Sequence, residues 1–294
     1  MPYLFLTLTL IGGLIKGFAG KKVSHDVTNL HDGFIVNTVR TLFCAAIGFL
    51  VAVSQVGISG FALTPAAFLV CLVSSVFMAL FAISWLYAYK SEAYVFLSVF
   101  TMLASVITGI LGRIVYGDEL KLTRILGFVI LFLAIYIMSF YNKNISGRIT
   151  KKAAITLFLG TLGVSLSDFM QKVYTKESLG EASVFTFYTY FLMLIPQIAV
   201  ILIFNAKKAE KNPSLLDKRH IIIFFIMSAA LYLNVLTKTI AVRNIPATQM
   251  YPTLQGANLI FSAILASLLF KEKITLKSAL GIAVALIAVV LMNI

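Results

Sequence analysis

Long apolar stretches alternate with short polar connections along the whole chain of 294 residues. An α-helix needs about 20 mostly apolar residues to cross the hydrocarbon core of a bilayer. The apolar stretches are continuous, and lipid cannot satisfy exposed backbone groups, so helices are expected rather than the alternating strands of a barrel. The pattern predicts an all-α membrane protein with ten transmembrane helices, at residues 3–20, 33–55, 66–89, 93–116, 123–140, 153–173, 183–204, 220–241, 247–270 and 275–293.

A short charged hairpin followed by a glycine occurs twice, in matching parts of the chain. Glu119 precedes Gly127 by eight residues, and Glu272 precedes Gly281 by nine. Other matches follow in the same order: Gly13, Lys22 and Val23 with Gly163, Lys172 and Val173, and Ala88-Tyr89-Lys90 with Ala241-Val242-Arg243. These matches indicate an internal duplication, in which Glu119 and Glu272 mark equivalent positions.

The duplication divides the chain at its polar midpoint. Residues 1–141 form the first predicted five-helix repeat, 142–152 the connecting loop, and 153–294 the second five-helix repeat. Since five is odd, the second repeat begins on the opposite face of the membrane, and the two repeats are predicted to be inverted copies. Inverted repeats recur in secondary transporters, whose halves move against each other to alternate access to a central site.

The composition agrees with a membrane protein and changes how the charge is interpreted. The chain is 60% hydrophobic and 12% charged, with a mean hydropathy of +0.99, whereas soluble domains have about 45–50% apolar and about 25% charged residues. The net charge of +13 is interpreted as loop charge that orients the helices, so no nucleic-acid partner is expected. Most Lys and Arg residues follow the odd-numbered helices, which places those loops in the cytoplasm and both termini outside.

Few residues support enzyme chemistry. His25, His31 and His220 lie in polar connections, and Cys44 and Cys71 lie in apolar stretches, as expected of small packing residues. No cluster has metal-binding spacing, and no phosphate-binding glycine loop is present. The chain is therefore predicted not to be an enzyme, to use no metal or cofactor and not to hydrolyse ATP.

Ionisable residues inside apolar stretches cost about 2.5–3.5 kcal/mol each at a helix centre, so each is a functional candidate. Asp168 either carries a proton or holds a cationic substrate, or else it is solvated at the helix end or paired with Lys172. Lys16 either binds an anionic group or extends its ammonium to the interface. Arg40 has the same two alternatives, and Lys238 is expected at the interface.

The hairpin residues are expected to be structural. Arg113 is expected to form an ion pair with a hairpin carboxylate. Glu119 and Glu272 are expected to cap the helix that follows each hairpin or to set the hairpin geometry, because an acid near a helix N-terminus gains about 0.3–1 kcal/mol from the helix dipole.

A polar stripe on one predicted helix is the main candidate substrate site. Tyr251, Gln255 and Asn258 share one helical face, and Pro252 and Gly256 interrupt the helix and release backbone carbonyls. The alternative role of this stripe is hydrogen bonding between helices. Further aromatic and amide candidates are Trp85, Tyr232 and Asn234. The tryptophan also suits an interfacial aromatic belt.

The charged hairpins, the glycines after them and the five-plus-five repeat resemble the drug/metabolite transporter superfamily, specifically its ten-span EamA-like members. The run from Pro252 through Glu272 to Gly281 is similar to the Pro…Glu…Gly run that ends each half in that family, whereas Ser98 stands where the first-half proline would be. The resemblance implies secondary transport of small metabolites or drugs through a central cavity. It also implies cytoplasmic termini, opposite to the charge distribution, so both orientations remain open.

Pattern and resemblance together predict a secondary active transporter of a small amphipathic metabolite, such as an amino acid, or of a drug. It would work by alternating access as a monomer or homodimer in the plasma or inner membrane, driven by a proton or cation gradient or by substrate exchange. An organic-cation or multidrug exporter would need Asp168 inside the cavity, and an anion carrier would need Lys16 or Arg40 there. The alternatives outside carriers are a lipid-handling membrane protein and a channel. The sequence identifies neither the solute nor the direction of transport.

Overall fold

The computed structural model describes residues 2–24, 26–90, 94–139, 151–207, 210, 212–270 and 276–293. These residues form ten α-helices and two short 3₁₀-helices, and no β-strand is found among them. The α-helices are α1 (Pro2–Ser24), α2 (Leu30–Val56), α3 (Pro65–Lys90), α4 (Tyr94–Tyr116), α5 (Leu122–Ser139), α6 (Lys151–Lys176), α7 (Ala182–Ala206), α8 (Lys218–Val242), α9 (Ala247–Phe270) and α10 (Leu276–Asn293). The 3₁₀-helices are Ser59–Phe61 and Pro213–Leu216. The predicted all-α class is confirmed.

Every predicted apolar stretch forms one helix, with ends within a few residues of the prediction. The two ends of α2 show the local signals that define them. The Asn29 side chain accepts a hydrogen bond from the Asp32 N–H at 2.9 Å at the start of the first turn. Gly57 ends the helix with a φ of 67°, which glycine adopts without a steric penalty.

Five of the described helices are long and apolar enough to cross a membrane by length and composition. They contain the spans Pro2–Gly20, Leu30–Val56, Pro65–Ser84, Ala182–Ala206 and Lys218–Val242. Three shorter apolar helical stretches are Leu103–Tyr116, Leu122–Ala134 and Ala279–Asn293. Large apolar side chains are exposed on these elements, such as Ile114 at 73% and Leu122 at 70%, which is typical of a lipid-facing surface. The crossing of the membrane by all ten helices stays a prediction.

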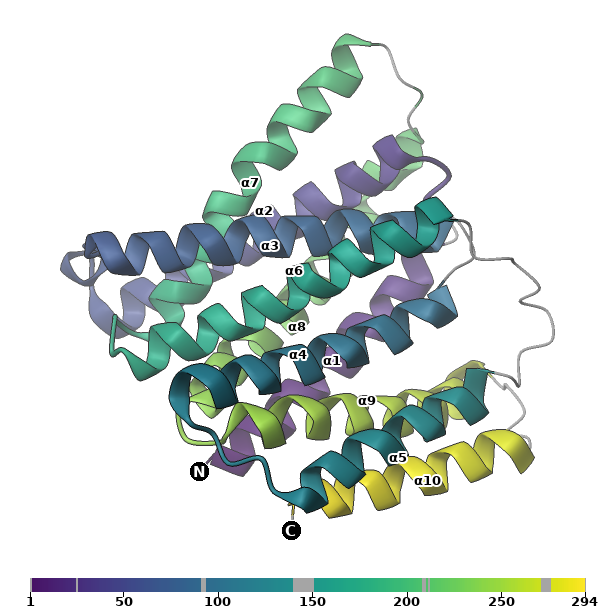
Figure 1. Ribbon diagram of the computed structural model, residues 1–294. Helices are drawn as coiled ribbons and strands as arrows, with labels where there is room; N and C mark the ends of the chain where they lie inside the picture. Colours follow the sequence, from purple (N-terminus) through teal and green to yellow (C-terminus); the bar gives the residue numbers. More distant parts are fainter. Residues whose placement is uncertain are drawn as a thin grey trace.

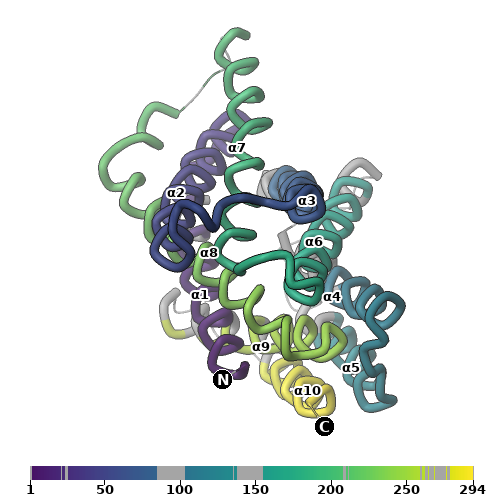
Figure 2. Tube along the Cα trace, turned by 90° about the vertical axis from the view of Figure 1, so that its left-hand side faces the viewer, coloured from purple at the N-terminus to yellow at the C-terminus, as the bar shows by residue number. Residues whose placement is uncertain are grey.

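The contacts between helices stay the same when each helix is replaced by its equivalent in the other half, from α1 with α6 to α5 with α10 (Figure 1). α1 packs against α8 as α6 packs against α3, and α2 packs against α8 as α7 packs against α3. The pairs α2–α7, α4–α9 and α5–α10 each join equivalent helices of the two halves. Figure 2 shows α3 beside α6 and α5 beside α10. This pattern of contacts is the one expected of two five-helix halves related by a two-fold axis, and it agrees with the predicted inverted repeat.

Glycines at equivalent places let the paired helices approach closely. A Cβ at Gly12 would lie 2.7 Å from the Ala230 carbonyl oxygen of α8, and a Cβ at Gly163 would lie 2.5 Å from the Phe77 carbonyl oxygen of α3. Contacts this short leave no room for a side chain. Both helix pairs, α1 with α8 and α6 with α3, therefore need a glycine at the point where their backbones are closest. In the packing, the equivalent of Gly163 is therefore Gly12, one residue away from the predicted match with Gly13. The equivalence follows from where the two helix backbones come closest, which the sequence match does not show.

Both chain termini lie near the connection between α8 and α9 (Figure 1). Phe5 of α1 packs against the cluster that contains Ile245, and Gln249 Nε2 donates a hydrogen bond to Asn293 Oδ1 at 3.0 Å. The termini thus share one end of the bundle, as an even number of crossings requires. The predicted connecting loop falls largely on residues 140–150, which lie outside the described residues, so the division into domains stays a prediction.

Candidate functional site

Asp168 is paired inside the helical bundle. Its side chain on α6 is 8% exposed, and Lys238 Nζ of α8 lies 2.5 Å from Asp168 Oδ1. Gln171 Nε2 donates a second hydrogen bond to the same oxygen at 3.3 Å. The alternative in which Asp168 pairs with Lys172 is therefore wrong, because α6 and α8 pack together and bring Lys238 to Asp168 from 70 residues away. Lys238, expected at the interface, instead points into the bundle, where pairing lowers the cost of both charges.

Tyr251 of α9 joins this ion pair. Its hydroxyl donates a hydrogen bond to the Asp168 carbonyl oxygen at 2.6 Å, and the Tyr251 ring centroid lies 5.9 Å from Lys238 Nζ. That separation is within the range of a cation–π contact. Tyr251 is buried. The predicted polar face of α9 therefore meets α6 and α8 at this residue.

One cationic side chain of the first half interacts electrostatically with the same ion pair. Lys16 of α1 lies within electrostatic range of Arg40 of α2, and also of Lys238 and Asp168. Lys16 and Arg40 are both half-buried. Lys16 makes no ion pair with any residue that the structure describes. Lys16 of the first half thus interacts electrostatically with an ion pair of the second half.

Two tyrosines complete this group. Tyr190 of α7 is 1% exposed and Tyr232 of α8 is 3% exposed. Neither hydroxyl has a hydrogen-bond partner within the described part of the chain. Tyr190 lies within electrostatic range of Arg40, Tyr232 and Asp168. We call this group the central cluster, which consists of Lys16, Arg40, Asp168, Tyr190, Tyr232, Lys238 and Tyr251.

Tyr190 was not predicted as a site residue. It lies in an aromatic-rich stretch of α7, where a single tyrosine does not stand out from its neighbours. The sequence offered only the tyrosine's polar hydroxyl inside an apolar stretch as an indication, because a buried tyrosine hydroxyl usually has a hydrogen-bond partner. Its unpartnered hydroxyl became visible only when the helices were assembled.

The predicted amides lie elsewhere on the same helices. Asn234 Nδ2 donates a hydrogen bond to the Thr9 carbonyl oxygen of α1 at 2.6 Å. Asn234 and Asn258 also face Gly13, where an added Cβ would lie 3.2 Å from Asn234 Nδ2 and from Asn258 Oδ1. For Asn234 this is helix–helix hydrogen bonding, the alternative considered for the polar residues of α9. Gln255 is half-buried on α9, and the side chain of Trp85 lies outside the described residues.

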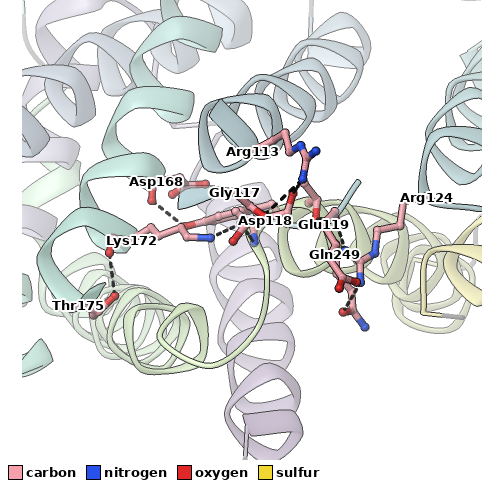
Figure 3. Close-up of polar contacts among 12 residues, drawn as sticks. Arg113, Gly117, Asp118, Glu119, Arg124, Asp168, Lys172, Thr175 and Gln249 are labelled. Carbon is pink, nitrogen blue, oxygen red and sulfur yellow. Dashed lines mark hydrogen bonds and ion pairs between the residues drawn. The ribbon is translucent and has the colours of Figure 1, made fainter. Parts of the chain in front are cut away.

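A second polar group lies at the end of the bundle that holds the termini. The Asp118 carboxylate, in the hairpin between α4 and α5, forms an ion pair with Lys172 of α6, whose side chain is 0% exposed. The same carboxylate accepts a hydrogen bond from the Ala247 N–H, at the start of α9, at 2.7 Å. Figure 3 shows Asp118 reaching Lys172 across the helices. We call these three groups the Asp118 latch, because they tie the hairpin of the first half to two helices of the second half.

Arg124 fastens the same hairpin from the start of α5. The residue is 6% exposed, and its guanidinium donates to the Glu119 carbonyl oxygen, to Thr248 Oγ1 at 3.0 Å and to Gln249 Oε1 at 3.3 Å. The arginine thus binds both the hairpin and the first turn of α9 (Figure 3). A buried guanidinium with several acceptors forms a rigid anchor.

Two expectations about the hairpin are wrong, namely the ion pair of Arg113 and the capping of α5 by Glu119. The alternative role of Glu119, to set the hairpin geometry, stays a prediction. Arg113 Nη1 donates to the carbonyl oxygens of Gly117 and Asp118, at 3.4 and 3.3 Å, rather than to a carboxylate. Glu119 is exposed, and the first turn of α5 contains no acidic residue. The acid that caps a helix is Asp118, and it caps α9 because the fold, not the chain order, brings that N-terminus nearby. Glu272 lies outside the described residues.

Metal ligands are not gathered in the described part of the chain. No group of three His, Cys, Asp or Glu side chains there could hold a metal ion. Cys44 and Cys71 are both buried and unbridged, in agreement with the predicted packing role.

Comparisons with known proteins agree with this arrangement. The model of the EamA-like transporter family matches residues 148–294, a segment that contains α6 to α10. This match supports the superfamily resemblance drawn from the hairpin motifs. A solved structure described as "Crystal structure of protein" has a similar fold, with a TM-score of 0.74 and 10% identity over 97% of this chain and 96% of that chain. No curated protein matches the chain.

Proposed function

Because the chain belongs to the EamA-like transporter family, we propose that it is a secondary active transporter that moves a small amphipathic metabolite by alternating access. The protein is an integral membrane transporter of small solutes. The central cluster carries the finer proposal. It gathers charged side chains where the two halves meet, which is the position of the solute site in transporters built from inverted repeats.

The two halves contribute different groups to this site. Lys16 and Arg40 belong to the first half, whereas Asp168, Lys238 and Tyr251 belong to the second. A rocking motion of the halves would change the distances between the two sets of groups. Such a motion would couple solute binding to access from either side of the membrane.

The Asp118 latch provides the closing contact at one end. Asp118 comes from the first half, while Lys172 and the Ala247 N–H come from the second. A carrier that opens at this end would have to separate these groups. We therefore assign the latch as the gate at the end of the bundle where the termini lie.

An organic-cation exporter is less well supported by the same geometry. Such a protein would use Asp168 to bind the cation, but Asp168 is already paired with Lys238. Lys16 also lies within electrostatic range of Asp168 and would repel a cation. The geometry therefore favours a solute that is not a simple cation.

The proposal is tested by counterflow in proteoliposomes loaded with one unlabelled solute at a time. We would use succinate, L-leucine, inorganic phosphate and tetraphenylphosphonium, with empty liposomes as the control. Saturable uptake of the labelled counterpart of any of them would support a carrier. Flux that rises linearly with concentration would indicate a channel, and chemical turnover of the liposome lipid would indicate a lipid-handling protein; either result would contradict the proposal.

A further inference from the structure

We propose that residues 212–217, which lead into α8, form a strap that closes the end of the bundle opposite the Asp118 latch and detaches from Asp32 when that end opens. This inference rests on the proposed transport function, because a carrier with alternating access needs a gate at each end. Three features carry it: the contacts of the strap with the first half, the burial of Asp32, and the contrast with the equivalent connection between α2 and α3.

The strap and the latch lie at opposite ends of α8. This helix begins at Lys218, directly after the strap, and ends at Val242, close to the Ala247 N–H that belongs to the latch. It contains 25 residues, so its two ends are about 37 Å apart at a rise of about 1.5 Å per residue. Both chain termini lie at the latch end (Figure 1). A contact at the strap can therefore close only the other end.

The strap is held by residues of the first half. The Asn212 N–H donates a hydrogen bond to Asp32 Oδ1 at 2.8 Å, and Asn212 Nδ2 donates to the Asp26 carbonyl oxygen at 3.1 Å. Asn212 Oδ1 also accepts from the Ser214 N–H at 3.2 Å, at the start of the 3₁₀-helix of the strap. Leu215 is 0% exposed and lies in an apolar cluster with residues of α1 and α2. Opening this end would have to break these contacts between the halves.

The carboxylate that holds the strap is buried, and its donors are neutral. Asp32 is 0% exposed, and its carboxylate accepts from the Thr28 N–H at 3.1 Å and from Thr28 Oγ1 at 2.6 Å, besides the strap. It forms no ion pair with any residue that the structure describes. Hydrogen bonds to a charged group are stronger than neutral ones, and water can replace a lost donor once the end is open. Asp32 would thus keep its Thr28 donors when the strap leaves, as a reversible contact requires.

The equivalent connection of the first half closes its own end through different chemistry. Residues 57–64 join α2 to α3 and also contain a 3₁₀-helix, Ser59–Phe61. Since α2 begins beside the strap, this connection lies at the latch end. The Phe61 ring centroid is 5.3 Å from that of Phe187, and the Phe61 carbonyl oxygen accepts from the Tyr188 hydroxyl at 2.9 Å. Apolar burial favours this contact in water, whereas the hydrogen bonds of the strap exchange with water, so the strap detaches more readily.

The first test is the rate of maleimide labelling of a Leu215→Cys reporter, since Leu215 is buried while the strap is closed. Asp32→Ala should accelerate labelling about tenfold or more, because a hydrogen bond to a charged acceptor is lost. Asp217→Ala is the matched control: Asp217 is an exposed carboxylate of the strap, its side chain makes no capping hydrogen bond, and its loss should leave labelling unchanged. Equal labelling of wild type, Asp32→Ala and Asp217→Ala would overturn the role of Asp32.

A milder variant keeps this test valid if Asp32→Ala does not elute as a single species in size-exclusion chromatography. Asn212→Ala leaves the Asp32 carboxylate in place and removes only the side chain that binds the Asp26 carbonyl oxygen and Ser214. It should also accelerate labelling of the Leu215→Cys reporter. Labelling at the wild-type rate in Asn212→Ala would then overturn the strap.

A second comparison distinguishes a gate from a contact that is only structural. In alternating access, opening one end favours closure of the other, because both ends draw on the same population of closed molecules. Asp118→Ala, which opens the latch, should therefore slow labelling of the Leu215→Cys reporter about twofold or more. Local loosening of the strap would not respond to a change at the far end. Unchanged or faster labelling in Asp118→Ala would overturn the gate.

The labelling experiments need no solute, so their outcome is separate from that of the counterflow assay. Saturable counterflow, together with labelling that Asp118→Ala does not slow, would overturn the strap as a gate and leave the transport function standing. Absence of saturable counterflow, together with slower labelling in Asp118→Ala, would count against the transport function and support the coupling between the two ends.

Discussion

Removal of the Asp118 carboxylate should open the end of the bundle that holds the termini. Asp118→Ala deletes the partner of Lys172, whose side chain is 0% exposed, and the acceptor of the Ala247 N–H. Breaking a buried ion pair by removing one partner costs about 3–5 kcal/mol, because an uncompensated charge stays buried. Loss of the helix cap adds about 0.5–2 kcal/mol. The closed arrangement should therefore lose at least about 3 kcal/mol relative to any arrangement in which Lys172 reaches water.

A loss of about 3 kcal/mol changes the ratio of closed to open molecules about a hundredfold, since each 1.4 kcal/mol is a factor of ten. The assay is the rate of maleimide labelling of a Thr175→Cys reporter, because Thr175 lies on α6 near Lys172 and is 8% exposed. Background labelling should be low, since Cys44 and Cys71 are both buried. We expect labelling to accelerate about a hundredfold in Asp118→Ala.

Three companion variants separate the possible causes. Glu119→Ala removes an exposed neighbouring carboxylate and should leave labelling unchanged. Asp118→Asn keeps an acceptor for the Ala247 N–H but loses the charge, so it should still open the latch. Adding Lys172→Met to Asp118→Ala removes the buried charge and should restore part of the melting temperature. If Asp118→Ala labels like wild type, or if the double variant melts lower than Asp118→Ala, the reasoning about the buried pair is refuted.

Three further predictions concern the packing and the central cluster. Arg124→Met should destabilise the protein by about 1.5–3 kcal/mol, because the buried guanidinium donates to several acceptors. The measurement is a lower melting temperature in detergent, and Arg113→Met, at an exposed site, should change that temperature little. Gly12→Ala should reduce the yield of monodisperse protein, because the added Cβ would lie 2.7 Å from a backbone oxygen of α8. A Cβ added at Gly17 has no neighbouring atom within 4 Å, so Gly17→Ala should behave as wild type. Tyr190→Phe removes a buried hydroxyl without a partner in the described chain, so its melting temperature should stay equal or rise while solute uptake in the counterflow assay falls. A large loss of stability would show that the hydroxyl is already satisfied.

Helix positions were predictable because the information is local. A stretch of about 20 apolar residues is long enough to cross a bilayer whatever surrounds it, and residues such as Asn29 and Gly57 define helix ends through contacts within a few positions. The internal duplication could also be predicted from the sequence, because the two equivalent hairpins contain similar residues in the same order. Even there, the match of Gly13 with Gly163 was one residue from the packing equivalence with Gly12.

The sequence by itself thus determined the ten helices, the membrane environment and the two related halves. It also singled out Asp168, Lys16 and Arg40 as costly charges in apolar surroundings. Only the tertiary structure decided their partners, because Asp168 finds Lys238 across 70 residues and Lys172 finds Asp118 across 54. Spacing along one helix predicts contacts three or four residues apart. The partner of a buried charge instead depends on which helices pack together, and most of the close helix pairs in this fold join one half to the other.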